Sequence, residues 1–323
     1  PVVQRTAWTE GTRNRAITLL SKKKNRTALV ERIVQFVRAR GFDGVNLDFE
    51  PIPAQVSEQY VTFVRELRAA LDDLDPGLHL SVDVVPGLEN YDLAALTSDD
   101  AADLAVIMGY GYTTRSSAVA GSTAPLSGGA IGDLSTSVAA ALDQTGGDGG
   151  RLMLALPWYG LSWPTQSATA GARVRTGDDV GNPTSAQYDA AVQAAAQGGR
   201  RYDPEQASAW TAYAAKDCSR CPATWRQVWY DDPDSFGAKI GHALEQGLAG
   251  VGIWAPGLDG EREELRWALR NQLRPRLDEA PPAGSPALDP QTVEGDIDGR
   301  DVVSGSASLR LFASDEAKGS GLG

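Results

Sequence analysis

The sequence of 323 residues has few of the side chains that bind metals or carry redox chemistry. It contains two histidines, His79 and His242, and two cysteines, Cys218 and Cys221. A zinc site would need two ligands beyond the Cys-x-x-Cys pair, and the histidines show no metal-ligand spacing. A thioredoxin-like role would need a βαβ context that the surrounding residues do not supply. We therefore expect no metal and no cofactor, and we interpret the cysteines as a local disulfide in an exported protein.

The sequence also lacks long apolar runs and an excess of basic residues. No run approaches the roughly 18 apolar residues that a membrane helix needs, so we expect no membrane span. The formal net charge of −12 disfavours a nucleic-acid partner. Residues 1–40 are the exception, with ten Lys/Arg and two Asp/Glu. We interpret the run Lys22–Lys24 as a solvated turn before a helix, and a contact with an anionic polymer is the alternative.

Short apolar strands alternate with helical stretches from residue 41 onward, which is typical of βα units around a parallel sheet. The strands are expected at residues 44–50, 78–85, 104–110, 152–157 and 250–256, after a first one around 2–8. The helices are expected at residues 28–40, 57–74, 131–142, 235–247 and 261–272.

Other stretches depart from this rhythm. Residues 160–232 are polar and rich in Gly and Ala with scattered aromatics, which indicates an insertion between two strands. Residues 279–290 have the composition of a linker. We therefore divide the chain into a domain at 1–278, a linker at 279–290 and the truncated start of a second β-rich module at 291–323.

The most informative segment is Asp-Gly-Val-Asn-Leu-Asp-Phe-Glu at residues 43–50. In a strand, its apolar side chains point to one face and Asn46, Asp48 and Glu50 point to the other. Strands of a parallel sheet are normally apolar on both faces. Three polar side chains in line, the last at the carboxyl end of the strand, therefore indicate a chemical role. A capped or salt-bridged strand end is the alternative.

This octet resembles the Asp-Gly-x-Asp-x-Asp-x-Glu signature of family 18 glycoside hydrolases, the chitinase-like group. Its variant, with asparagine at position 46, is similar to that of bacterial members acting on peptidoglycan or spore cortex. Four more segments resemble the family in the right order, at residues 108–112, 154–160, 227–232 and 250–254. Of these, 227–232 resembles the segment that re-enters the barrel after the insertion.

The resemblance covers about residues 6–272 and implies an α/β fold, the (β/α)8 TIM barrel. The octet would be the fourth strand, and the insertion would lie between strands seven and eight. Only about forty residues precede the octet, so we expect strands one and two to be missing and the chain to be a fragment of a longer protein. Neither an initiating Met nor a signal peptide is present, which agrees with a trimmed or incomplete start at Pro1.

The resemblance also implies roles for individual residues. Glu50 would be the general acid, and Asp48 would bind the acetamido N–H of the substrate and stabilise its oxazolinium, in the substrate-assisted exception to two-carboxylate glycosidases. Tyr110 would bond the acetamido carbonyl. Asn46 stands in place of the first aspartate, where it can donate a hydrogen bond to Asp48 but cannot take up its charge. Trp254 would form the hydrophobic floor under the sugar, with a barrel-core aromatic as the alternative.

Three further residues, Tyr159, Asp43 and Met108, are weaker candidates for substrate binding. Gly111 departs from the family, which usually has aspartate there. The expected function is retaining hydrolysis of an N-acetylglucosamine polymer, chitin or peptidoglycan glycan, by a secreted or cell-wall-associated monomer. The alternative is a non-catalytic, lectin-like member of the same fold. Retention of Glu50 favours the enzyme, while Gly111 keeps the alternative open.

Overall fold

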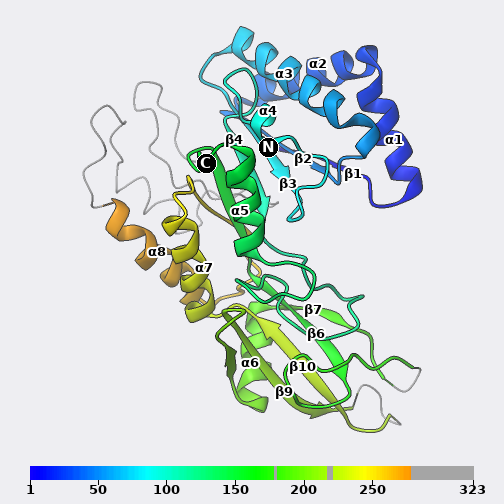
Figure 1. Cartoon of the computed structure of the whole chain (residues 1–323), viewed down its shortest axis with the longest axis vertical. Coiled ribbons are helices and arrows are strands. Elements are labelled where there is room, and N and C mark those ends of the chain that lie inside the picture. The colour runs from blue at the N-terminus through cyan, green and yellow to red at the C-terminus, as the bar shows by residue number, and fades with distance from the viewer. Residues whose placement is uncertain (178–179, 217–220, 278–323) are drawn as a thin grey trace.

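The computed structural model describes residues 1–177, 180–216 and 221–277. The predicted linker at 279–290 and the module at 291–323 lie outside these residues. Two sheets dominate the fold (Figure 1): a six-stranded sheet in the upper part and a five-stranded sheet below it. No helix in the described part of the chain combines the length and the apolar character needed to cross a membrane.

The six-stranded sheet is parallel throughout, in the order β1-β2-β3-β4-β5-β11. Its strands are β1 (Val2–Thr6), β2 (Gly44–Glu50), β3 (His79–Val84), β4 (Leu104–Met108), β5 (Leu152–Pro157) and β11 (Gly250–Trp254). All six predicted strands are thus confirmed to within two residues at each end, and so is the pairing of β2 with β3. Edge strands β1 and β11 do not pair with each other, so within the described ranges the sheet is open and not a closed barrel.

Helices connect and cover these strands. They are α1 (Glu10–Ser21), α2 (Lys23–Arg40), α3 (Ser57–Leu74), which follows the short 3-10 turn η1 (Ala54–Val56), α4 (Leu93–Leu96), α5 (Leu134–Gln144), α7 (Pro233–Glu245) and α8 (Glu264–Leu277). Gly41 ends α2 in the left-handed conformation, with φ 63°. Helix α5 begins three residues later than predicted, because the Asp133 side chain accepts a hydrogen bond from the Thr136 N–H and caps it.

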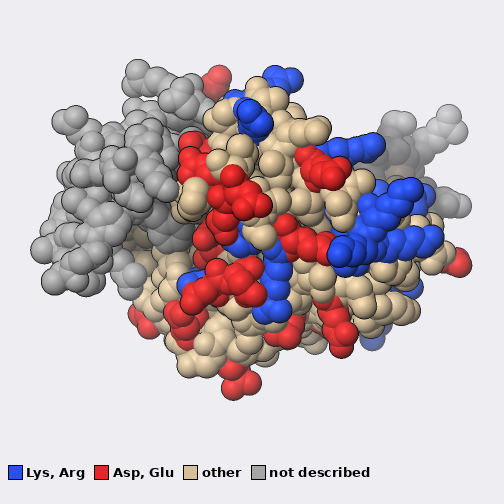
Figure 2. Space-filling view, turned by 90° about the horizontal axis from the view of Figure 1, so that it is seen from above, with Lys and Arg blue, Asp and Glu red and all other residues tan. Residues whose placement is uncertain are grey.

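The basic N-terminal region lies at the surface. All three lysines of the run Lys22–Lys24 are exposed, as predicted, but only Lys22 lies between α1 and α2. Lys23 and Lys24 already belong to the first turn of α2, so the predicted turn is shorter than three residues. Figure 2 shows a large group of Lys and Arg side chains at the right of the face seen from above, with smaller groups at its top and among the Asp and Glu side chains of its middle.

Helix α3 decides which way β2 faces. Its buried residues recur with helical spacing at Tyr60, Phe63, Val64, Leu67 and Leu71. The rings of Tyr60 and Phe63 stack on Phe49 of β2, with centroids 5.7 and 5.6 Å away. Burial of Phe49 under α3 therefore turns the polar side chains of β2 to the opposite face of the sheet.

The predicted insertion is a folded unit with its own antiparallel sheet, in the order β7-β6-β10-β9-β8. Its elements are β6 (Tyr159–Thr165), β7 (Thr184–Gln187), α6 (Tyr188–Gly198), β8 (Arg201–Asp203), β9 (Ser208–Ala215) and β10 (Thr224–Tyr230). Residues 227–230 lie in β10, so this segment does not itself re-enter the parallel sheet as expected. The chain returns to that sheet only at β11, after α7.

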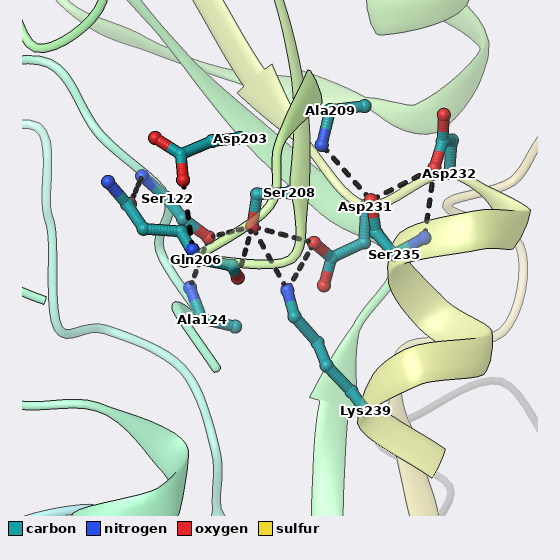
Figure 3. Close-up of polar contacts among 10 residues, drawn as sticks. All are labelled: Ser122, Ala124, Asp203, Gln206, Ser208, Ala209, Asp231, Asp232, Ser235 and Lys239. Atoms are coloured by element: carbon teal, nitrogen blue, oxygen red, sulfur yellow. Dashed lines mark hydrogen bonds and ion pairs between the residues drawn. The ribbon is translucent and has the colours of Figure 1, made fainter. Parts of the chain in front are cut away.

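A buried polar network joins the insertion to α7. Figure 3 shows Lys239 of α7 reaching toward Asp231, which follows β10, and Ser208 of β9. The Lys239 ammonium forms an ion pair with Asp231 and donates to the Ser208 hydroxyl at 3.2 Å. Asp232 caps α7 by accepting from the Ser235 N–H at 3.0 Å. Because Lys239 has 0% exposed surface, this pair is out of reach of solvent.

Candidate active site

Side chains from β1, β2 and β3 meet on the face of the sheet away from α3. Gln4 of β1 donates through Nε2 to Asp48 Oδ2 at 2.7 Å. Asn46 donates through Nδ2 to Asp83 Oδ1 at 2.9 Å and to Ser81 Oγ at 3.0 Å, both on β3. Asn46 could donate to Asp48 from its position in the octet but does not, because Ser81 and Asp83 of β3 accept both hydrogens of the amide nitrogen.

Glu50 ends β2 at the carboxyl edge of the sheet, where active sites of α/β folds lie. Burial and the negative charge of Asp48 raise the pKa of Glu50 to about 7, against a hydrogen bond from Trp8 that lowers it. Trp8 follows β1 and is 60% exposed. A carboxyl with this pKa is partly protonated at neutral pH, so Glu50 can act as a proton donor and then as a base.

Asp48 lies two residues before Glu50, about 6.5–7 Å along the same face of the strand. It is 4% exposed, and burial raises its pKa while the hydrogen bond from Gln4 lowers it. Its Oδ1 is buried and accepts no hydrogen bond from the described residues. A ligand N–H would satisfy this oxygen, because a buried acceptor without a donor is costly.

Three aromatic residues from separate elements complete the site. The ring of Tyr110, after β4, lies 6.5 Å from that of Trp254 at the end of β11 and 6.2 Å from that of Tyr159 at the start of β6. Burial raises the pKa of Tyr110, and the charge of Asp83 adds to this effect, so the phenol stays neutral and can donate a hydrogen bond. The structure therefore brings these three predicted residues together.

Two other predicted residues have different surroundings. Met108 is buried at the end of β4 and belongs to the hydrophobic core. Asp43 precedes β2, seven residues before Glu50 and about 23 Å along the strand. Its carbonyl accepts from the His79 N–H at 2.8 Å, at the amino edge of the sheet. The assignment of Asp43 to substrate binding is corrected on this ground, because Asp43 lies at the opposite end of the strand from Glu50.

Gly111 has φ 89°, which side chains rarely adopt, and a Cβ added there would meet no atom within 4 Å. Backbone conformation, not lack of space, thus favours glycine where the family usually has aspartate. The predicted disulfide stays a prediction, because Cys218 lies outside the described residues.

Sequence reasoning missed Gln4, Trp8, Ser81 and Asp83. Ser81 and Asp83 carried the same signal as the octet, since they alternate with apolar residues in a strand predicted to be parallel. Gln4 and Trp8 had no such signal, because their role depends on the register between β1 and β2.

Comparison with known proteins assigns the chain to a family. The sequence pattern that defines glycosyl hydrolases family 18 matches residues 8–259. Over 243 residues the chain is 24% identical to YdhD of Bacillus subtilis, whose name describes a sporulation-specific glycosylase; this covers 73% of the chain and 52% of YdhD. The chain thus spans about half the length of the curated relatives it matches.

Solved structures agree on the fold. A family 18 chitinase from Cycas revoluta in complex with (GlcNAc)4 superposes with a TM-score of 0.70 at 22% identity, over 84% of this chain and 80% of the other. A chitinase-like agglutinin from Robinia pseudoacacia gives a TM-score of 0.68 at 21% identity, over 84% of this chain and 80% of the other. With a family match over most of its length, the chain belongs to glycosyl hydrolase family 18.

Proposed function

We propose that the protein hydrolyses β-glycosidic bonds of N-acetylglucosamine-containing polymers, with retention of configuration and assistance from the substrate. The observation that carries the proposal is the pair on β2. Glu50 has a pKa of about 7, and the neighbouring Asp48 has a buried oxygen that no described residue contacts by a hydrogen bond. The polymer is chitin or peptidoglycan glycan. We also propose that the open sheet is part of a (β/α)8 barrel, in which two more strands lie between β11 and β1.

In the first step, protonated Glu50 donates its proton to the glycosidic oxygen as that bond breaks. The carbonyl oxygen of the substrate's own acetamido group attacks the anomeric carbon and forms an oxazolinium. Asp48 accepts the acetamido N–H through its free Oδ1 and stabilises the positive charge. Tyr110 donates to the acetamido group, and Trp254 packs under the sugar ring.

In the second step, the carboxylate of Glu50 takes a proton from water, which attacks the anomeric carbon and opens the oxazolinium ring. Two displacements at the same carbon retain its configuration, and the acetamido group and Glu50 return to their starting states. Because the nucleophile belongs to the substrate, the protein needs no second carboxylate across the bond.

The experiment compares chitin oligosaccharides and purified peptidoglycan with their de-acetylated forms. We expect cleavage of at least one acetylated polymer to the β-anomer, detected by NMR, and no cleavage of its de-acetylated form. A thiazoline analogue of the oxazolinium should inhibit. Equal cleavage of the de-acetylated polymer would contradict substrate assistance.

The pH profile offers a separate prediction. Glu50 must carry its proton in the free enzyme, so kcat/KM should fall about tenfold per pH unit above pH 7. On the acid side Asp48 must be ionised, and its raised pKa should place that limb above the range usual for aspartate. Initial rates between pH 3 and 10 test both limbs. Constant activity from pH 6 to 9 would exclude Glu50 as the acid.

The second candidate is sugar binding without catalysis, favoured by Gly111 in place of the family aspartate. The agglutinin of Robinia pseudoacacia is a relative in fold whose name describes such a role. Binding of chitin oligosaccharides by calorimetry, with no cleavage of chitin or peptidoglycan, would favour this candidate. Export is a further proposal, supported by the Cys-x-x-Cys pair and testable by culture fractionation. A monomeric state is also proposed, and light scattering tests it.

A further inference from the structure

Strand β3 brings to the site a carboxyl group that the mechanism above does not use. Asp83 Oδ1 accepts from Asn46 Nδ2 at 2.9 Å, and the same nitrogen donates to Ser81 Oγ at 3.0 Å. An amide nitrogen has two hydrogens, so both are used by β3. Asp83 and Ser81 thereby fix the orientation of the Asn46 side chain.

This orientation affects Asp48 as well. The Asn46 Oδ1 and the Asp48 Oδ1 are both buried without a partner among the described residues. If the Asn46 amide rotated, its N–H groups could turn from β3 toward Asp48 and compete with a ligand for the free oxygen. By accepting from the Asn46 amide, Asp83 therefore prevents a hydrogen bond from Asn46 to the Asp48 Oδ1.

Asp83 also belongs to the charge cluster of the site. Burial raises the pKa of Asp83 to about 7, a hydrogen bond from Asn46 lowers it, and the charges of Asp48 and Glu50 raise it further. The influence is mutual, since an ionised Asp83 must also favour the protonated form of Glu50. With two pKa values near 7, Glu50 and Asp83 should titrate as a coupled pair.

Other groups around Asp83 do not compensate its charge. Tyr60 of α3, Tyr91 after β3 and Tyr110 after β4 have pKa values raised mainly by burial, and the charge of Asp83 adds to each. These phenols stay neutral at physiological pH. Among the described residues, the charged groups that act on Asp83 are therefore Asp48 and Glu50 of β2.

We propose that Asp83 is a positioning residue, which holds the Asn46 amide away from Asp48 and supplies the negative charge that keeps Glu50 protonated. The proposal rests on the proposed role of Glu50 as the acid. In this proposal, β3 supplies through Asp83 the carboxylate that is absent at position 46 of β2, where the side chain is an amide.

The kinetic test compares Asp83→Asn with the exchange variant Asn46→Asp/Asp83→Asn. Loss of the charge should move the alkaline limb of kcat/KM down by roughly one pH unit or more, because a neighbouring carboxylate raises the pKa of a carboxyl group. The substitution also replaces the carboxylate that accepts from Asn46 by a neutral amide oxygen, and this weaker hydrogen bond should hold Asn46 less firmly and lower kcat roughly tenfold. The exchange variant again has one carboxylate and one amide in contact, so it should recover most of the lost kcat and most of the shift in the alkaline limb.

Asp100→Asn is the control, at an exposed aspartate that pairs with Arg65 at 3.1 Å. It should change neither kcat nor the alkaline limb.

A titration without substrate keeps this test independent of catalysis. In the wild-type protein, ¹³C NMR of the carboxyl groups should show two inflections for Glu50, one of them at the pKa of Asp83. In Asp83→Asn the second inflection should vanish and the pKa of Glu50 should fall by roughly one unit. A single wild-type inflection, or an alkaline limb unmoved in a folded Asp83→Asn variant, would overturn the proposal. Failure of every variant and the wild type to hydrolyse any polymer would reject the proposed function, while the titration would still decide the role of Asp83.

Discussion

Glu50→Gln is expected to lower kcat by roughly 10²- to 10⁴-fold while leaving sugar affinity close to wild type. Glutamine has nearly the same shape and can keep a polar contact with Trp8, but it has no proton to give to the leaving oxygen. The alkaline limb near pH 7 should also disappear, since the acid whose loss of a proton causes this limb is gone. Steady-state kinetics and calorimetric binding of chitin oligosaccharides measure the two effects separately.

Glu58→Gln is the matched control for this change. Glu58 is exposed in the first turn of α3, so its substitution removes the same charge at a distance from the site. It should behave as wild type. Full hydrolysis by Glu50→Gln would reject the acid role, whereas binding without hydrolysis by wild type and variant alike would favour the sugar-binding alternative.

Lys239→Met should cost about 3–5 kcal/mol of unfolding free energy, because it leaves the carboxylate of Asp231 buried and unpaired. Burial raises the pKa of Asp231 even in the wild type, and the ammonium of Lys239 opposes this effect. Without the ammonium the carboxyl should titrate at still higher pH. Urea denaturation at pH 5 and pH 8 measures the loss at each pH.

The sign of the pH effect follows from that shift. An acid whose folded-state pKa lies above its unfolded value contributes stability at low pH, and this contribution is lost as pH rises. The loss caused by Lys239→Met should therefore be larger at pH 8 than at pH 5. Lys24→Met, at an exposed lysine, should stay within about 0.5 kcal/mol. The double change Asp231→Leu/Lys239→Met should recover much of the stability. A loss below about 1 kcal/mol, or one independent of pH, would contradict this account.

The strands and the carboxylate pair on β2 were predictable from local pattern. Alternation along residues 43–50 places Asp48 and Glu50 on one face whatever surrounds the strand, because successive side chains of a strand point to opposite sides. The same regularity located the other parallel strands. The substrate-binding prediction for Asp43 failed, because the motif continues along the whole strand whereas the site lies toward the carboxyl edge of the sheet.

Other parts of the site depend on contacts between segments far apart in the chain. Asn46 and Asp83 are 37 residues apart, and Gln4 and Asp48 are 44 apart. Neither pair has a local signature, since which side chains face each other depends on the register of two strands. Lys239 is similar: its partner Asp231 lies outside its helix, and the pair is buried only because α7 packs against β9.

The sequence by itself thus determined the βα rhythm, the family resemblance and the carboxylate pair, because these depend on periodicity and on neighbours two residues apart. Only the tertiary structure decided that Asn46 bonds β3, that Asp83 joins the charge cluster, and that the pKa of Glu50 rises to about 7. Burial and the spacing of charges set these properties, and both arise when distant strands come together.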